Sequence, residues 1–370
     1  MQHAEGQARL CADISLNGKG TTLWFGVEEA QEEYLCAQRS DAFVMALLLT
    51  AMRGGHDMEC VTPMSERLHY QLENFLIPSL VAAGKLYRPM KIHAPLTSEK
   101  VANKGAVGTA FSGGVDSLYT VMTHGKDSPY PLTHVTNFNL GVFEGPGYHQ
   151  AFQKACANAK TFAHEMGLAF VGLDSNIYEV LPERYLDVFS FRLLAGALAL
   201  QGLCSVYLFS SSHDFGHFQF NLRVSSTFDL LNVHCTQTES MTVYSAGGAR
   251  TRNEKIRALK DWAPAHRWLH FCIFGAPGTK NCGKCKKCNR DMTALYALGA
   301  IDKFGAVIDL PAFYRSLPGK IGFVLANREE RLCRETAQLI KESGVQIPAA
   351  AYVFEKQFLK ALENLREGQK

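Results

Sequence analysis

The first hundred residues combine two kinds of hydrophobic pattern. Apolar and polar side chains alternate on both sides of the turn Asn17-Gly18-Lys19-Gly20, and Asn-Gly favours tight hairpin turns. Later apolar positions recur at helical spacing, and one such stretch begins after Thr62-Pro63. We therefore expect a small N-terminal α/β domain over residues 1–97. Its predicted elements are a hairpin over 8–28, helices over 41–52 and 64–83, and a strand over 88–92.

From Ala106 onward, short apolar runs alternate with stretches of helical spacing. This order predicts right-handed βαβ units and a parallel sheet that helices cover on both faces. Ligands of such sheets bind at the carboxyl ends of the strands. The sequence thus predicts an α/β fold with a Rossmann-like core over 98–300 and a helical C-terminal extension over 301–370. The predicted strands are 107–111, 134–138, 168–173 and 205–209, and the predicted helices begin near 117 or span 151–166, 192–201, 329–343 and 353–366.

Composition narrows the class of protein. Of the 370 residues 47% are hydrophobic, so the chain can bury a large core, and the net charge is only +3. This mild charge argues against a nucleic-acid or membrane-surface partner. The N-terminus carries no secretory pattern, and no apolar run reaches the length of a membrane span. We expect a cytoplasmic protein, with the oligomeric state open and a homodimer as one option.

The segment Ser112-Gly113-Gly114-Val115-Asp116-Ser117 lies between a predicted strand and a predicted helix. The glycines allow the backbone to approach a phosphate, and the N–H groups and dipole of the helix start favour its charge. Ser112 and Ser117 add hydroxyl donors, while Asp116 is suited to hold Mg²⁺. The loop lacks the Gly-Lys-Ser/Thr of the Walker type. The alternative is an ordinary junction in which the serine and aspartate only cap a helix.

Four of the eleven cysteines, Cys272, Cys282, Cys285 and Cys288, fall within seventeen residues. Two C-x2-C spacings and one upstream cysteine are typical of a closed tetrahedral Zn²⁺ site, which is structural because it leaves no open position. A cysteine-bound [4Fe–4S] cluster is the rival occupant. The remaining seven cysteines are scattered among apolar residues and are expected to be reduced thiols.

The two motifs together resemble a known family. SGGVDS resembles the SGGxDS loop of the PP-loop ATP pyrophosphatase (adenine nucleotide alpha-hydrolase) superfamily, whose core is HUP-like. The string RWLHFCIFGAPGTKNCGKCKKCNR is similar to the C-terminal element of its 7-cyano-7-deazaguanine synthase branch. The resemblance covers roughly Val107 to Asp291, and it implies cleavage of ATP between the α and β phosphates, with AMP placed on an acceptor oxygen.

The resemblance also implies roles for residues between the motifs. Asn137 and Phe138 end a strand where the superfamily holds adenine through backbone groups, and Arg192 resembles an arginine at a helix start of the synthases. Lys255, with Arg252, lies where the synthases have a lysine that opens a helix, so it is expected to neutralise phosphate charge. Asp214 follows a buried strand, which favours it as a Mg²⁺ or substrate ligand.

The chain also departs from the synthases. The stretch Leu140 to Gly147 replaces a tyrosine-glycine-glutamine segment, and a tyrosine-proline-aspartate-cysteine segment is missing after Asp214. About a hundred residues in front and seventy behind have no counterpart in the housekeeping enzyme. Enlarged proteins of this kind occur in antiphage operons, including type IV CBASS, where the resemblance implies that a deazaguanine is joined to a protein amine.

The resulting hypothesis is an ATP-dependent ligase that acts on a deazaguanine-type carboxylate, 7-carboxy-7-deazaguanine or an analogue. ATP and Mg²⁺ serve the reaction and Zn²⁺ is structural. The nitrogen nucleophile is expected to be an amine of a protein encoded nearby, with ammonia as the alternative. Two other hypotheses remain: an RNA-modifying thiolase, for which a reactive cysteine near the loop is expected, and a non-catalytic nucleotide-binding partner in a defence complex.

Overall fold

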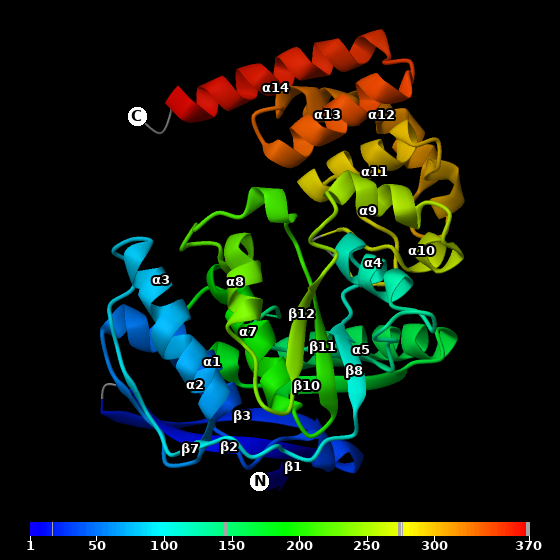
Figure 1. The fold of residues 1–370 in the computed structure, drawn as a ribbon. Coiled ribbons are helices and arrows are strands. Elements are labelled where there is room, and N and C mark those ends of the chain that lie inside the picture. The colour runs from blue at the N-terminus through cyan, green and yellow to red at the C-terminus, as the bar shows by residue number, and fades with distance from the viewer. Residues whose placement is uncertain (17, 144, 146, 273–274, 276, 368–370) are drawn as a thin grey trace. The chain divides into compact units, whose positions relative to one another are not determined.

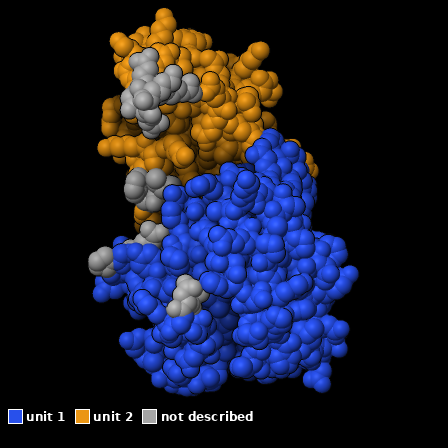
Figure 2. Space-filling model, turned by 90° about the vertical axis from the view of Figure 1, so that its left-hand side faces the viewer, with its two compact units in different colours: residues 1–111, 123–249 blue, residues 112–122, 250–370 orange. Residues whose placement is uncertain are grey.

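The computed structural model describes residues 1–16, 18–143, 145, 147–272, 275 and 277–367. The chain forms two compact units (Figure 2), unit 1 with residues Met1–Phe111 and Thr123–Ala249, and unit 2 with Ser112–Met122 and Arg250–Lys370. These two units are defined by contacts between residues within the chain. The three predicted domains, over residues 1–97, 98–300 and 301–370, stay a prediction. Asn17 of the predicted hairpin turn, Glu144 and Pro146 of the stretch Leu140 to Gly147, and Ala276 between the first two cysteines of the cluster lie outside the described residues.

A mixed eight-stranded sheet forms the centre of unit 1 (Figure 1), in the order β1-β2-β3-β10-β9-β8-β11-β12. The five strands from β8 to β12 run parallel, as the alternating pattern predicted. Near-continuous apolar runs suit strands that are buried on both faces. The parallel strands are β8 (Ala106–Ala110), β9 (His134–Phe138), β10 (Ala169–Ser175), β11 (Cys204–Ser210) and β12 (Thr242–Ala246).

The N-terminal hairpin belongs to this same sheet. β2 (Gln7–Leu16) and β3 (Lys19–Glu28) pair antiparallel, which confirms the predicted hairpin, and the short β1 (Gln2–Ala4) pairs with β2. β3 also pairs antiparallel with β10, through Gly26 opposite Asp174 and Phe25 opposite Ser175. The sequence did not predict this long-range pairing, because hydrophobic alternation does not specify which strand becomes a neighbour.

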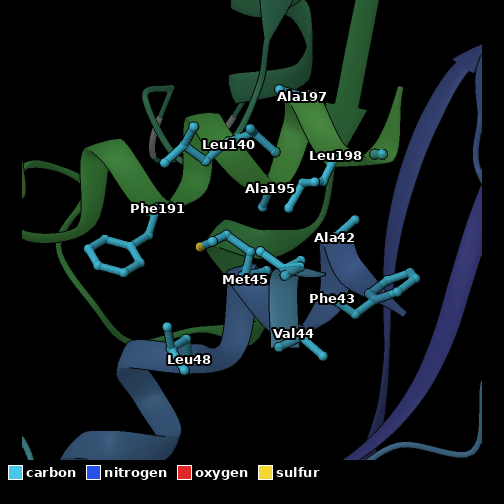
Figure 3. Packing of buried hydrophobic residues seen from close by; sticks show 14 of the residues in the cluster. Ala42, Phe43, Val44, Met45, Leu48, Leu140, Phe191, Ala195, Ala197 and Leu198 are labelled. Carbon is cyan, nitrogen blue, oxygen red and sulfur yellow. The ribbon is translucent and has the colours of Figure 1, made fainter. Parts of the chain in front are cut away.

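Helix α1 (Asp41–Gly54) fills the core between α7 (Tyr185–Ala199) and the hairpin (Figure 3). Met45 and Leu48 are fully buried on α1, and Ala195 on α7 is small enough for the two helices to approach closely. The ring of Phe43 lies 5.2 Å from that of Phe25 on β3. Truncating one such buried side chain to alanine typically costs ~2–5 kcal/mol.

The other elements of unit 1 are short, apart from the crossover helix α5. The helix expected over 64–83 begins after Ser65, whose hydroxyl accepts the N–H of Leu68, and it passes through a π-helical turn. The strand expected over 88–92 is reduced to two residues. These elements are η1 (Glu29–Tyr34), β4 (Met58–Glu59), β5 (Met64–Ser65), α2 (Glu66–Gln71), η2 (Leu72–Leu76), α3 (Ile77–Ala82), β6 (Ile92–His93), β7 (Leu96–Thr97), α5 (Tyr148–Glu165), α6 (Ile177–Val180), η3 (Phe215–His217), η4 (Ser225–Phe228) and α8 (Asp229–His234).

The regular secondary structure in the described residues of unit 2 is helical. The predicted C-terminal helices are present as α13 and α14, while α12 was not predicted because its two prolines and two glycines interrupt the helical pattern. None of the helices in the described ranges is long and apolar enough to cross a membrane. The elements are α4 (Val115–Thr123, whose last residue falls in unit 1), α9 (Arg252–Leu259), α10 (Ala263–Trp268), α11 (Lys286–Ala297), η5 (Ile301–Phe304), α12 (Leu310–Ala326), α13 (Arg331–Ser343) and α14 (Ala349–Glu367).

Candidate phosphate loop and metal centre

The loop that precedes α4 is held in a conformation that requires glycine. Gly113 has φ of +67°, and a Cβ built there would lie 2.8 Å from Cβ of Pro277 and 3.0 Å from the carbonyl oxygen of Trp268. Its own carbonyl accepts a hydrogen bond of 2.8 Å from the N–H of His270. The loop therefore rests on the segment just before Cys272, and a side chain at Gly113 would separate the two.

Hydroxyl and N–H groups gather at the start of α4. The hydroxyls of Ser112 and Ser117 lie 3.2 Å apart, and the N–H of Gly114 donates to Ser112 Oγ. Within the described ranges, no acceptor is recorded for the N–H groups of Val115 and Asp116. Unsatisfied donors at a helix N-terminus, reinforced by the helix dipole, make a site that can accept an anion.

Asp116 is paired with two cations from α9. Its Oδ1 lies 2.7 Å from Nζ of Lys255, and its Oδ2 lies 3.2 Å from Nη1 of Arg252. The sequence suggested an open carboxylate, but the side chain is only 21% exposed and Lys255 is 2% exposed. Asp116 therefore neutralises buried charge in this structure, and any role as a Mg²⁺ ligand requires it to exchange partners.

Arg252 connects the loop to helix α11. It donates from Nη2 to Oδ2 of Asp291 at 2.8 Å, and Arg290 donates from Nε to Oδ1 of the same carboxylate at 2.8 Å. Burial raises the pKa of Asp291, but the two guanidinium groups outweigh it and hold that pKa well below its usual range. Asp291 lies one helical turn after Cys288 on α11, so this helix carries both a member of the cysteine cluster and a member of the ionic chain that reaches the loop. The sequence did not predict this connection.

The four cysteines of the predicted metal site come together. All four Sγ atoms lie within 4.8 Å of one another. Two of the separations are 4.0 Å, between Cys272 and Cys285, and 3.8 Å, between Cys282 and Cys288. A tetrahedron with Zn–S bonds of about 2.3 Å has S···S edges of about 3.8 Å. The four thiols are unpaired as disulfides, and their spacing fits a four-coordinate ion such as Zn²⁺.

Backbone N–H groups point at these sulfurs. The N–H groups of Lys284 and Cys285 both lie 3.4 Å from Sγ of Cys282. Burial raises the pKa of Cys282, but these two donors, together with the neighbouring thiols of Cys272 and Cys288, outweigh burial and lower the pKa to about 6. Cys288 behaves in the opposite way, because burial and the adjacent Cys285 raise its pKa. The cluster thus supplies a thiolate at neutral pH, and a bound cation would stabilise the others in that form.

Asn281 fixes the segment that carries Cys272. Its Oδ1 accepts the N–H groups of Phe271 and Cys272, each at 3.1 Å, and its Nδ2 donates to the carbonyls of Leu269 and Val307. The side chain is almost fully buried. Sequence reasoning missed this residue, although an asparagine directly before the first C-x2-C cysteine was a usable signal. Asn281 thus holds the backbone of Cys272 in place, as supporting residues commonly do at metal sites.

The other predicted site residues lie in unit 1. Asn137 and Phe138 are the last residues of β9, and Asp214 lies 2.6 Å from His217 Nδ1 just after β11. Arg192 is 2% exposed, and its guanidinium donates to the carbonyls of Leu140 and Glu183. These contacts make Arg192 a support for the 140–141 turn, and its direct catalytic role stays a prediction.

A second polar cluster, which the sequence analysis did not predict, lies at the carboxyl ends of strands β9 and β10 and includes one residue of α5. Nδ1 of His149 lies 2.8 Å from Oδ2 of Asp174, and Nδ2 of Asn139 donates to Oδ1 of that carboxylate at 2.6 Å. Asp174 is 6% exposed and the imidazole is 40% exposed. A buried carboxylate that orients a half-exposed histidine is an arrangement suited to proton transfer. Its signal in the sequence was only a polar residue directly after a predicted strand.

Comparison of the chain with protein-family models, with curated proteins and with solved structures found no match. The candidate function therefore depends on the chemistry of the site and on the motif resemblance.

Proposed function

We propose that this protein is a PP-loop ATP pyrophosphatase that adenylates a carboxylate and then forms an amide. The observation that carries the proposal is the combination of Gly113, two adjacent serine hydroxyls and open N–H donors at the start of α4. Arg252, Lys255 and Arg290 form one ionic chain with the carboxylates of Asp116 and Asp291, and Arg290 also lies 3.9 Å from Glu330. The two cations of α9 and the converging donors at the start of α4 favour a polyanion such as a triphosphate.

In the proposed reaction, a carboxylate oxygen of the substrate forms a bond to the α-phosphorus of ATP, and the α–β phosphoanhydride bond breaks. Pyrophosphate leaves, and a nitrogen nucleophile then displaces AMP from the acyl group and loses a proton. Bound Mg²⁺ would neutralise charge on the phosphate oxygens. The donors of Ser112 and Ser117 and the cations of α9 would hold the departing pyrophosphate, so catalysis rests on positioning and charge stabilisation.

The substrate is proposed from the motif resemblance. SGGVDS followed by the cysteine knuckle favours 7-carboxy-7-deazaguanine or a close analogue as the carboxylate. The added N- and C-terminal segments favour a protein amine over ammonia as the acceptor, since small substrates do not require them. The family assignment to PP-loop enzymes of the deazaguanine synthase branch belongs to the same proposal.

The cysteines of unit 2 favour this proposal over a thiolase. A thiolase needs a thiolate nucleophile near the phosphate loop. Apart from the four clustered cysteines, unit 2 contains only Cys333. That thiol is buried, and burial raises its pKa to about 12. The other alternative, a non-catalytic nucleotide-binding role, predicts that the protein binds ATP without converting it to AMP and pyrophosphate.

Product analysis tests the proposal. The purified chain is incubated with ATP, Mg²⁺ and 7-carboxy-7-deazaguanine, and nucleotides and pyrophosphate are quantified. We expect AMP and pyrophosphate in equal amounts, and carboxylate-dependent exchange of labelled pyrophosphate into ATP. Ser117→Ala should slow both, whereas Ser316→Ala, at an exposed serine of α12, should not. Formation of ADP would contradict the proposal, and the absence of any turnover with bound ATP would favour the non-catalytic role.

A further inference from the structure

Lys320 on α12 is a buried ammonium group beside the cysteine cluster. The residue is 3% exposed. Its Nζ donates to the carbonyl of Gly283, which lies between Cys282 and Cys285, and to Oδ1 of Asn289 at 3.3 Å. Asn289 directly follows Cys288, so both acceptors of Lys320 belong to the segment that carries three of the four cysteines.

This lysine lacks the partner that a buried cation normally has. In the part of the chain that the structure describes, no carboxylate oxygen lies within 4.0 Å of its Nζ. Buried lysines are rare, and an uncompensated ammonium is costly to remove from water. By contrast the other buried cations of unit 2, Lys255, Arg252 and Arg290, each pair with Asp116 or Asp291. A negative charge other than a carboxylate must therefore offset the cost of removing the Lys320 ammonium group from water.

The cysteine cluster is that source. Burial lowers the pKa of Lys320, and charge on Cys288, Cys282 and Cys285 acts against this by raising it. Four thiolates around one divalent cation carry a net charge of −2, which is itself unfavourable in a partly buried site. One cation and one metal–thiolate group of opposite sign thus offset each other's desolvation cost.

We propose that Lys320 is the counter-charge of a metal–tetrathiolate centre and joins the C-terminal helical extension to that centre. The lysine acts as a positioning residue, because it holds the Gly283 carbonyl and neutralises the cluster without binding the metal. Metal binding and the docking of α12 stabilise the same folded arrangement, so each must favour the other. Metal binding therefore stabilises the docking of α12, and the docked α12 tightens the hold on the metal. This inference does not depend on the proposed ATP chemistry.

Zinc competition tests the proposal. Zinc-loaded wild type, Lys320→Met and Lys320→Arg are titrated with a coloured chelator of known affinity, with Lys341→Met, at an exposed lysine of α13, as the matched control. Loss of a supporting group at a metal site typically costs 10–100-fold in affinity, so we expect a loss of at least about tenfold for Lys320→Met. Lys320→Arg, which keeps the charge, should retain most of the affinity, and the control should match wild type.

Replacing zinc with cobalt tests whether Lys320 only positions the cysteine cluster or also binds the metal. Co²⁺-loaded Lys320→Met should keep the sulfur-to-metal charge-transfer absorption of four thiolates, because no ligand is removed. Zinc affinity equal to wild type in Lys320→Met would overturn the proposal. If that variant fails to fold, Lys320→Gln is compared with Lys320→Arg, and equal affinities for zinc would overturn it. Hydrogen exchange of residues 310–326 should also rise when zinc is removed from wild type, and unchanged exchange there would refute the coupling.

Discussion

Nζ of Lys255 lies 2.7 Å from Oδ1 of Asp116, and this pair joins a nearly inaccessible lysine to the centre of the candidate phosphate loop. The carboxylate of Asp116 offers a counter-charge to the buried ammonium group, so both side chains are held in place at the start of α4. A phosphate that took over the lysine would release Asp116 to a metal ion.

The first prediction concerns this pair. Asp116→Asn should lower the free energy of unfolding by ~1–3 kcal/mol, because Lys255 loses its closest counter-charge in a buried site. Lys255→Met keeps the apolar stem and should cost less stability, but it should weaken ATP binding because it removes a cation. Chemical denaturation and calorimetric titration with ATP measure the two effects. Unchanged ATP affinity in Lys255→Met would contradict the role given to this lysine.

The second prediction concerns Gly113, with Gly105 as a matched control. Both glycines have positive φ, +67° and +69°, but a Cβ at Gly105 meets no atom within 4 Å. Alanine at either position should cost ~1–2 kcal/mol for the left-handed backbone. Only Gly113→Ala should also abolish ATP binding, because its Cβ would push the loop away from Pro277. Wild-type affinity in Gly113→Ala would show that the loop geometry is irrelevant to the nucleotide.

The third prediction concerns Asp291, whose carboxylate is shared by Arg252 and Arg290. Asp291→Asn should destabilise the protein by ~3–5 kcal/mol, because it leaves buried guanidinium charge without its partner. Since the folded state holds the pKa of Asp291 below its ordinary value, this stabilisation is complete above that value and is lost as the pH falls below it.

The difference between wild type and Asp291→Asn should therefore be large at pH 7 and shrink below about pH 4. Urea denaturation at several pH values measures it. Asp127→Asn, at an exposed aspartate in a turn, controls for the loss of one charge. A difference that stayed constant from pH 7 to pH 3 would argue against an ionised Asp291.

The fourth prediction is one zinc ion per chain by elemental analysis. Iron with a visible absorption band, or freshly purified protein without metal, would defeat the assignment. Cys285→Ala should lower stability and yield, because a structural zinc contributes to folding directly. It should leave the preference among carboxylate substrates unchanged, since the closed shell leaves no position for substrate.

The fifth prediction separates support from catalysis at Arg192. Lysine at this position keeps the charge but cannot reach both carbonyls as the planar guanidinium does. If Arg192 supports the 140–141 turn, Arg192→Lys should lose ~1–3 kcal/mol of stability. A catalytic role predicts instead full stability with slow turnover. Arg184→Lys, at an exposed arginine just before α7, is the control.

Local patterns in the sequence were enough to predict much of this fold. The strand over 134–138 and the helix starting at Asp41 are confirmed, since each has clear spacing and clear ends. Helix α7 begins seven residues before the predicted Arg192, because it is apolar on nearly every side and shows little periodicity. β12 was missed for a similar reason, since its five residues are short and partly polar.

Some residues of the candidate site could be predicted from the sequence, and others could be found only in the structure. The phosphate loop and the cysteine cluster could be found because their residues are close in sequence and their spacing has chemical meaning. Asn281, Asp291 and Lys320 act through contacts with segments up to 39 residues away, such as that of Asp291 with Arg252. Apart from the place of Asn281 directly before Cys282, no single-sequence pattern distinguishes these residues from ordinary surface polar groups, because only folding determines which groups they contact.

The pairing of β3 with β10 has a consequence for shortened forms of the protein. Residues 1–28 are part of the central sheet, and removing them would uncover the backbone hydrogen-bonding groups at the carboxyl end of β10, where Asp174 and Ser175 pair with β3. An exposed, largely apolar strand edge is a template for pairing between molecules. A shortened protein of this kind should therefore associate through this strand edge, and a charged residue or proline placed on β10 would be needed to prevent it.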